Sequence, residues 1–214
     1  MAKADHIPAP AIRRLSLYLR QLETFDGNKR RTVSSRVLGQ ALGLTDAQVR
    51  KDLAYFGQFG HPGIGYRVPE LIQRVRRILG TDKKAKVLLV GAGNLGRALI
   101  SYRGFGKRGF DIVAVFDNDR SKVGKETPPP DSVRIRGLDD LSAVVRSHGI
   151  RVGILAVPAD AAQGVADVMV GAGIRGILNF APVTLHVGPE VGVASVDLAV
   201  QLEQLAFQVS VLTP

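Results

Sequence analysis

Glycines at positions 91, 93 and 96 form the spacing G-x-G-x-x-G, the pattern in this chain that is most directly tied to ligand chemistry. In dinucleotide-binding folds the first glycine allows a tight turn, the second lets a pyrophosphate approach the backbone, and the third permits close helix–strand packing. An apolar run at residues 87–90 precedes the pattern, and residues 97–100 follow with helical character. The phosphates would lie at the positive end of that helix. The cofactor-binding candidates are Gly91, Ala92, Gly93, Asn94, Leu95 and Gly96.

Asp117 ends the next apolar run, residues 112–116, and lies 21 residues after Gly96. An acid in that place accepts hydrogen bonds from the hydroxyls of an adenine ribose. Its charge would repel a 2′-phosphate, so it favours NADH and NAD+ over NADP and over the phosphorylated ribose of CoA. Asp119 is the alternative acid if the strand ends two residues later. The alternative for the whole segment is a glycine-rich turn without a ligand.

The elements that must position these residues alternate along the chain from Lys86 onward. Apolar runs predict strands at 87–90, 112–116, 152–157 and 176–180, and helical patterns predict helices near 94–102, 138–148 and 160–172. Strands that alternate with helices form a parallel sheet with helices on both faces. The predicted fold class is therefore α/β, with a Rossmann-like doubly wound parallel sheet that binds its ligand beyond the carboxyl ends of the strands.

The first 82 residues have a different, mainly helical pattern. Apolar spacing predicts helices over residues 9–25 and 35–42, and a third helix from Thr45 to about Phe56. Thr45 and Gln48 have the spacing of a capping box, in which Thr45 caps the helix and Gln48 reaches back to it. Two helices joined by a short glycine-containing turn, the second of them basic, indicate a helix-turn-helix.

Residues 57–68 place glycines around two short β-prone pieces, which predicts the hairpin of a winged helix. The third helix of a helix-turn-helix enters the major groove, and the tip of the hairpin could enter a minor groove. The DNA-binding candidates are Gln48, Arg50, Lys51, Tyr55 and, at the tip, His61. Charge supports a polyanionic partner for the front half, because residues 1–82 and 83–108 each carry +7, whereas residues 109–214 carry −4.

Composition excludes several other kinds of site. The 214 residues include no cysteine, so disulfides, thiol nucleophiles and thiolate metal sites are absent. The four histidines (His6, His61, His148 and His186) lack the spacing of metal ligands. The sequence has no apolar run long enough to span a bilayer and no apolar segment of the secretory type near residue 1. We therefore expect a cytoplasmic protein without a metal or membrane partner.

Residues 197–212 predict a helix with two apolar faces. Leu198, Leu202, Leu205, Val209 and Leu212 share one face, and Val200, Phe207 and Val211 fall on roughly the opposite one. Because a helix that covers a single surface needs only one apolar stripe, two stripes predict burial on both sides. A partner subunit is the expected second surface, and the alternative is a helix wedged between domains of its own chain.

Along nearly its whole length the chain resembles the Rex family of redox-sensing transcriptional repressors. The resemblance rests on residues 48–57, 63–66, 91–96, 102–105, 179–182 and 196–198. It implies a homodimer that binds double-stranded operator DNA, is released by NADH, and binds NAD+ without release. We accordingly divide the chain into a winged-helix DNA-binding domain at 1–82, an NAD(H)-binding domain at 83–195 and, at 196–214, a dimerisation helix swapped between subunits.

The same resemblance implies a switch made of three residues. Arg20 and Tyr102 would compete for Asp197: an Asp197–Arg20 pair holds the DNA-competent form, and a Tyr102–Asp197 contact accompanies release. The residues alone leave the alternative that Asp197 only caps its helix. Some relatives carry an aromatic residue where this chain has Leu198, so a stacking contact with the nicotinamide is not expected from that position.

Two other classes of protein fit part of the sequence. A small NAD-dependent dehydrogenase would use the same glycine loop, but the chain has no distinct substrate domain, and His186 is its lone acid–base candidate. A CoA-binding regulator is the second alternative, because this type of sheet also carries CoA. The repressor is favoured because a basic helix-turn-helix and a nucleotide-binding pattern stand in one chain.

Overall fold

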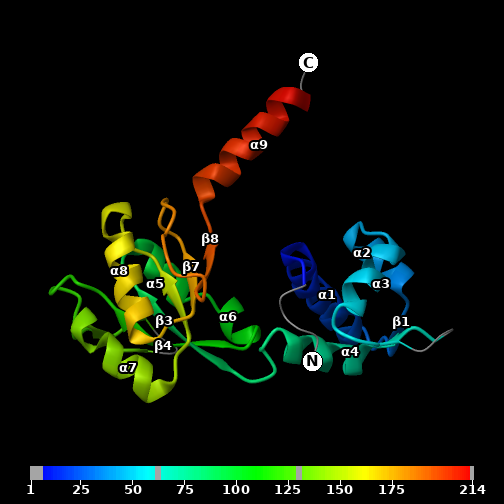
Figure 1. Cartoon of the computed structure of the whole chain (residues 1–214), viewed down its shortest axis with the longest axis horizontal. Helices are drawn as coiled ribbons and strands as arrows, with labels where there is room; N and C mark the ends of the chain where they lie inside the picture. Colours follow the sequence, from blue (N-terminus) through cyan, green and yellow to red (C-terminus); the bar gives the residue numbers. More distant parts are fainter. Residues whose placement is uncertain (1–6, 61–63, 129–131, 213–214) are drawn as a thin grey trace. The chain divides into compact units, whose positions relative to one another are not determined.

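The computed structural model describes residues 7–60, 64–128 and 132–212. The chain divides into two compact units, Met1–Lys83 and Lys84–Pro214, which are described one at a time (Figure 1).

Unit 1 is a helical bundle with a small two-stranded sheet. Its elements are α1 (Ala9–Gly27), β1 (Thr32–Val33), α2 (Ser35–Leu42), α3 (Asp46–Ala54), β2 (Tyr66–Arg67) and α4 (Val68–Ile78). The turn between α2 and α3 follows from its residues: Gly43 takes a left-handed φ of 66°, and the Thr45 hydroxyl accepts the Gln48 N–H. One buried cluster joins all four helices, and it includes Leu15, Leu19, Leu22, Leu38, Val49, Leu53, Leu71 and Val75. The predicted helix-turn-helix is confirmed.

The predicted hairpin differs from the structure in how its strands pair. We expected two short strands within residues 57–68, but residues 57–60 form no strand. Instead β2 pairs antiparallel with β1, from the segment before α2. The distant partner was missed because Thr32–Val33 is only two residues long, too short for an alternating pattern to be visible. His61 lies outside the described residues.

Unit 2 is built on six parallel strands. Its elements are β3 (Ala85–Val90), α5 (Asn94–Ile100), α6 (Gly104–Lys107), β4 (Phe110–Phe116), β5 (Ile135–Arg136), the 3-10 helix η2 (Leu138–Asp140), α7 (Leu141–His148), β6 (Val152–Leu155), α8 (Ala159–Ala172), β7 (Gly176–Asn179), β8 (Gly192–Ser195) and α9 (Leu198–Leu212). The strand order is β5-β4-β3-β6-β7-β8. The chain therefore starts in the middle of the sheet, moves to one edge, and then returns to the other side of β3, which confirms the doubly wound sheet.

Both faces of this sheet are covered, as β3 shows most clearly. Leu88 and Val90 belong to a cluster that includes residues of α7 and α8, whereas Val87 and Leu89 belong to a cluster that includes residues of α5 and α6. All four side chains are buried, which explains why the strand is continuously apolar instead of alternating.

Two edge strands, β5 and β8, were not predicted. β5 has only two residues, and β8 is a Gly-Val-Ala-Ser segment in which every residue is exposed. An exposed edge strand carries no hydrophobic signal, so only its hydrogen bonds to β7 define β8.

The last helix, α9, leaves β8 and runs away from the sheet (Figure 1). Its apolar side chains are exposed on both faces, with 67% of Leu202 and 68% of Phe207 accessible. The two apolar faces predicted for this helix are therefore both left uncovered by the described residues of unit 2.

Candidate cofactor site and nucleic-acid interface

The glycine loop lies directly beyond β3, where the chain path reverses between β3 and β6. Gly91 has a left-handed φ of 103°, and a Cβ there would overlap with the carbonyl oxygen of Ala156, just beyond β6. A Cβ on Gly96 would overlap with the carbonyl oxygen of Gly91. These two glycines are therefore required by the fold itself.

Gly93 is a glycine for a different reason. Its φ of −74° and ψ of −164° suit any residue, and apart from its chain neighbours no heavy atom of the described residues lies within 4 Å of the position that a Cβ would occupy. The space in front of this backbone is open, immediately before α5 begins at Asn94. Such a cradle fits a pyrophosphate, which must approach the backbone more closely than a side chain would allow. Asn94 and Leu95 are exposed beside it, and Ala92 is buried.

Asp117 follows β4 and braces the glycine loop. Its Oδ2 accepts the N–H of Ala92 at 2.8 Å and the ammonium of Lys122 at 3.1 Å, while Oδ1 accepts the N–H of Asp119 at 2.8 Å. Because each carboxylate oxygen can accept about two hydrogen bonds, Oδ1 retains capacity for a ribose hydroxyl. Only 6% of Asp117 is exposed, at the strand end where the sequence predicted an acid.

Lys122 was not recognised as part of this site from the sequence. Its ammonium also lies 3.4 Å from Asp119, and the hydrogen bond to Asp117 raises the pKa of Lys122. Hydrogen bonds from Ser121 and Lys122 lower the pKa of Asp119. Lys122 follows Asp119 by three residues in a turn, and this spacing could have indicated from the sequence that the two side chains meet.

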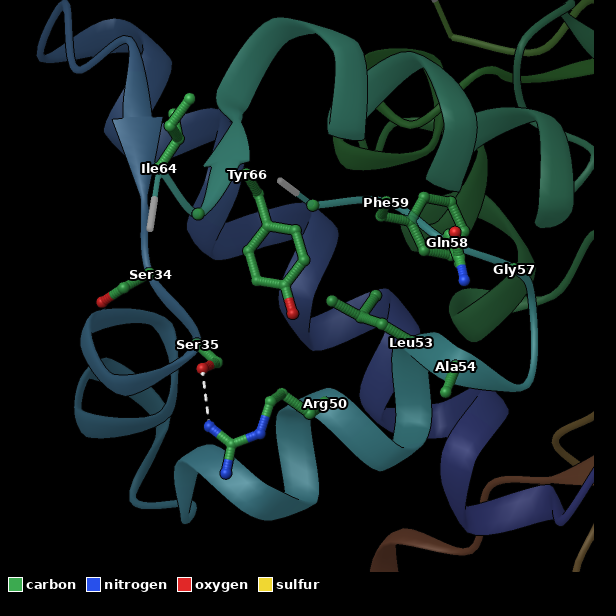
Figure 2. Close-up of a pocket in the computed structure, with 12 residues that line it drawn as sticks. Ser34, Ser35, Arg50, Leu53, Ala54, Gly57, Gln58, Phe59, Ile64 and Tyr66 are labelled. Atoms are coloured by element: carbon green, nitrogen blue, oxygen red, sulfur yellow. Dashed lines mark hydrogen bonds between the residues drawn. The ribbon is translucent and has the colours of Figure 1, made fainter. Parts of the chain in front are cut away.

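Arg50 and Lys51 lie exposed on α3. The guanidinium of Arg50 is 2.6 Å from Asp46 Oδ2 and 3.2 Å from the Ser35 hydroxyl, and its hydrogen bond lowers the pKa of Asp46. Figure 2 shows this Arg50–Ser35 contact at the rim of a hollow of about 520 Å³, into which the Tyr66 ring points. Burial raises the pKa of the Tyr66 hydroxyl. The hollow joins α3 to the segment around β2, the two parts of unit 1 from which DNA contacts were predicted.

Gln48 and Tyr55 are half-buried, in contrast to their basic neighbours on α3. The side chain of Gln48 does not reach back to complete a capping box; its Nε2 donates to Asp52 Oδ1 at 2.7 Å. In a capping box the Gln48 carbonyl oxygen would accept the N–H of Thr45, but the amide instead turns toward Asp52, where its N–H makes a charge-assisted hydrogen bond to a carboxylate.

Both units of the chain are similar to known protein families. A family model described as "CoA binding domain" matches residues 82–183, and one described as "Putative DNA-binding protein N-terminus" matches residues 6–54. The redox-sensing transcriptional repressor Rex of Carboxydothermus hydrogenoformans is 50% identical over 207 residues, which cover 97% of this chain and 98% of the relative. The same repressor of Desulforamulus reducens is 49% identical over 208 residues, again covering 97% and 98%.

The chain belongs to the Rex family. Rex proteins are redox-sensing transcriptional repressors, so this chain is a regulator and not a dehydrogenase.

Two solved Rex structures support the same assignment. The structure of RSP with beta-NAD+ and operator DNA matches with a TM-score of 0.89 and 36% identity, covering 95% of this chain and 92% of the other. The structure of RSP with beta-NADH matches with a TM-score of 0.83 and 35% identity, covering 95% and 94%. RSP is described as a Rex-family repressor.

The three residues predicted to form the switch have the following surroundings. Arg20 is exposed on α1. Tyr102 is 59% exposed and packs edge-on against Phe105, with ring centroids 5.1 Å apart. Asp197 caps α9, because its Oδ1 accepts the N–H groups of Ala199 and Val200 at 2.9 and 3.2 Å. The cap matches the alternative role considered for Asp197, and the switch stays a prediction.

Among the described residues, no helix combines the length and the apolarity needed to cross a membrane. The same residues contain no group of three or more metal-binding side chains.

Proposed function

We propose that this chain binds operator DNA through α3 of unit 1, holds NADH or NAD+ at the glycine loop of unit 2, and is released from DNA by NADH. It would act in the cytoplasm. The observation that carries the proposal is Gly93, whose missing side chain is required by no contact among the described residues and leaves open space for a pyrophosphate. RSP, which shares the fold, has been crystallised with both forms of the cofactor and with operator DNA.

In this proposal residues 91–96 hold the cofactor through backbone atoms, and the first N–H groups of α5 face the phosphates because they lack partners within the helix. Asp117 accepts a hydroxyl of the adenine ribose. A buried carboxylate at this place disfavours the phosphorylated ribose of CoA, although the matching domain model carries that name.

Asp117→Ala is expected to weaken NADH binding and to narrow the preference for NADH over NADPH. The change removes both the acceptor for the ribose and the charge that repels a 2′-phosphate, and it frees the Ala92 N–H. NADH and NADPH titrations followed by fluorescence measure both effects. Asp119→Ala, in the same turn but 42% exposed at its side chain, is the control. Equal binding of the two cofactors by the wild type would contradict the role given to Asp117.

For DNA, we propose that Arg50 and Lys51 contact base edges and phosphate, with Tyr55, Gln48 and His61 as further contacts. The Arg50→Ala, Lys51→Ala variant is expected to lose operator affinity, at a cost of about 1–3 kcal/mol for a base-reading arginine. Arg77→Ala, which removes an exposed charge from α4, is the control for net charge. Wild-type operator affinity in the double variant would refute this assignment.

We further propose a homodimer in which α9 lies between the subunits, swapped from one to the other. The proposal is supported by the apolar side chains on both faces of α9, which the rest of the chain leaves exposed. A second copy of the chain supplies the matching apolar surface. Two copies also suit an operator with two half-sites, because a dimeric helix-turn-helix binds two half-sites related by its own symmetry.

Release requires NADH to bind one arrangement of the subunits better than another. We propose that Arg20 pairs with Asp197 in the DNA-bound arrangement and that Tyr102 takes its place on release. The test is an operator titration with NADH, NAD+ and NADPH on the wild type, Arg20→Ala and Tyr102→Phe. Arg20→Ala should weaken operator binding and, by reciprocity, tighten apparent NADH binding, whereas Tyr102→Phe should blunt release. If both variants bind and release like the wild type, the three residues are not the switch.

A further inference from the structure

A fully buried carboxylate joins the recognition helix α3 to α1. Asp52 accepts four hydrogen bonds from three side chains: Arg14 Nε at 2.5 Å and Nη2 at 2.8 Å, the Tyr18 hydroxyl at 2.6 Å, and Gln48 Nε2 at 2.7 Å. Asp52 is 0% exposed, and Tyr18 is 0% exposed as well. No buried side-chain polar atom among the described residues lacks a partner, so this network is fully satisfied.

The network keeps Asp52 ionised. Burial by itself opposes the charge, but the hydrogen bonds from Arg14, Tyr18 and Gln48 outweigh it and lower the pKa of Asp52. The pKa of the Tyr18 hydroxyl is raised by burial and by the hydrogen bond to Asp52, so Tyr18 keeps its proton and remains a hydrogen-bond donor. An ionised carboxylate has no proton to donate, so only the nitrogen end of the Gln48 amide can face it.

The contact with Asp52 determines which hydrogen-bonding groups of Gln48 remain available to a ligand. One N–H of Nε2 is held by Asp52, which leaves the second N–H and the carbonyl Oε1 available. Gln48 is the third residue of α3, in the part of a recognition helix that reaches base edges. Gln48 is half-buried because it lies between an exposed and a buried neighbour on the same side of α3. Lys51, three residues later, is exposed, and Asp52, four residues later, is buried.

Resting on the proposed DNA binding, we propose that Asp52 is a positioning residue that fixes the Gln48 amide to pair with an adenine in the major groove. The free N–H donates to adenine N7 and Oε1 accepts from adenine N6, the bidentate pair that glutamine forms with adenine. Guanine presents two acceptors there, O6 and N7, and the fixed amide would set its own oxygen against O6. The network thus specifies a base as well as holding two helices together.

The probe is a pool of DNA duplexes with a randomised segment, from which the full-length wild-type chain selects its preferred sequence. Gln48→Met, which removes both hydrogen-bonding groups, identifies the base pair that depends on Gln48. At that position the wild type should prefer adenine by about tenfold. Replacing this adenine with 7-deazaadenine, which lacks the N7 acceptor, should weaken binding by the wild type and leave binding by Gln48→Met unchanged.

The role of Asp52 is tested with a variant that replaces Arg14, Tyr18 and Asp52 at the same time. Replacing Asp52 alone would leave the charge of Arg14 without its partner. Arg14→Met, Tyr18→Phe, Asp52→Leu replaces the charges with apolar groups of similar size, a kind of change that folds often tolerate. Tyr18→Phe alone is the matched control, because Arg14 and Gln48 still hold the carboxylate. Thermal melting and NADH titration show that each variant is folded. The triple variant should lower the adenine preference to less than about twofold, whereas Tyr18→Phe should retain it.

The outcomes separate this inference from the proposed function. If the folded triple variant selects the same base as the wild type at that position, Asp52 does not position Gln48 and the inference is wrong. Equal weakening of the wild type and Gln48→Met by 7-deazaadenine also overturns the inference, because the Gln48 amide then makes no contact with adenine N7. A wild type that selects no sequence at all overturns the repressor function, and the inference with it.

Discussion

Replacing Gly93 with serine is expected to weaken NADH binding about 100-fold while leaving the melting temperature unchanged or slightly raised. Apart from its chain neighbours, no described residue lies within 4 Å of the added Cβ, and the residue stands at the N-cap of α5, where serine is favoured. The new side chain instead occupies the space of the pyrophosphate. Losing charge-assisted hydrogen bonds to the phosphates costs about 3 kcal/mol, which is about 100-fold in affinity.

Gly96→Ala is the matched comparison, because it changes a glycine of the same loop that the fold itself requires. Its Cβ would overlap with the Gly91 carbonyl oxygen, so the loop or α5 must shift and the melting temperature must fall. Calorimetry and NADH fluorescence on both variants separate the two roles. A Gly93→Ser chain that binds NADH like the wild type would show that this glycine does not face the cofactor.

Features that depend on one short segment, such as this glycine loop, could be predicted from the sequence. The alternation of apolar runs with helical patterns was sufficient to predict the parallel sheet, and the glycine spacing with the acid after the next strand predicted a ligand site at its carboxyl edge. Each of these signals is local. The same holds for the turn between α2 and α3, where Thr45 has the predicted capping role and Gly43 supplies the glycine of the predicted turn. Local patterns succeed where one short segment determines the geometry.

Features that depend on distant partners were not predictable. Asp52 and Arg14 are 38 positions apart, and nothing in either neighbourhood indicates that their side chains meet. The pairing of β1 with β2 joins two-residue strands that are also far apart in the chain. For Gln48 the capping-box spacing was present, but Asp52, four residues later on the same helix, is buried by the folded bundle and accepts the Gln48 amide instead.

The other large effect is expected on α9. Leu202→Arg, Leu205→Arg should convert the proposed dimer to a monomer, because it places two charges on one of the two apolar stripes that are expected to be buried. Both side chains are exposed within their own chain, at 67% and 54%, so the fold of each unit and its NADH binding should survive. Sedimentation measures the oligomeric state, and an NADH titration checks the cofactor site.

The operator affinity of this double variant should decrease because the dimer is lost. A monomer holds one half-site at a time, and losing the linked second contact lowers affinity by about 100-fold or more. Gln208→Arg places a charge between the two apolar faces, so it is the control that should remain dimeric. A double variant that is still dimeric and still binds its operator tightly would mean that α9 does not hold the subunits together. A variant that is monomeric yet binds DNA like the wild type would mean instead that one copy is sufficient for repression.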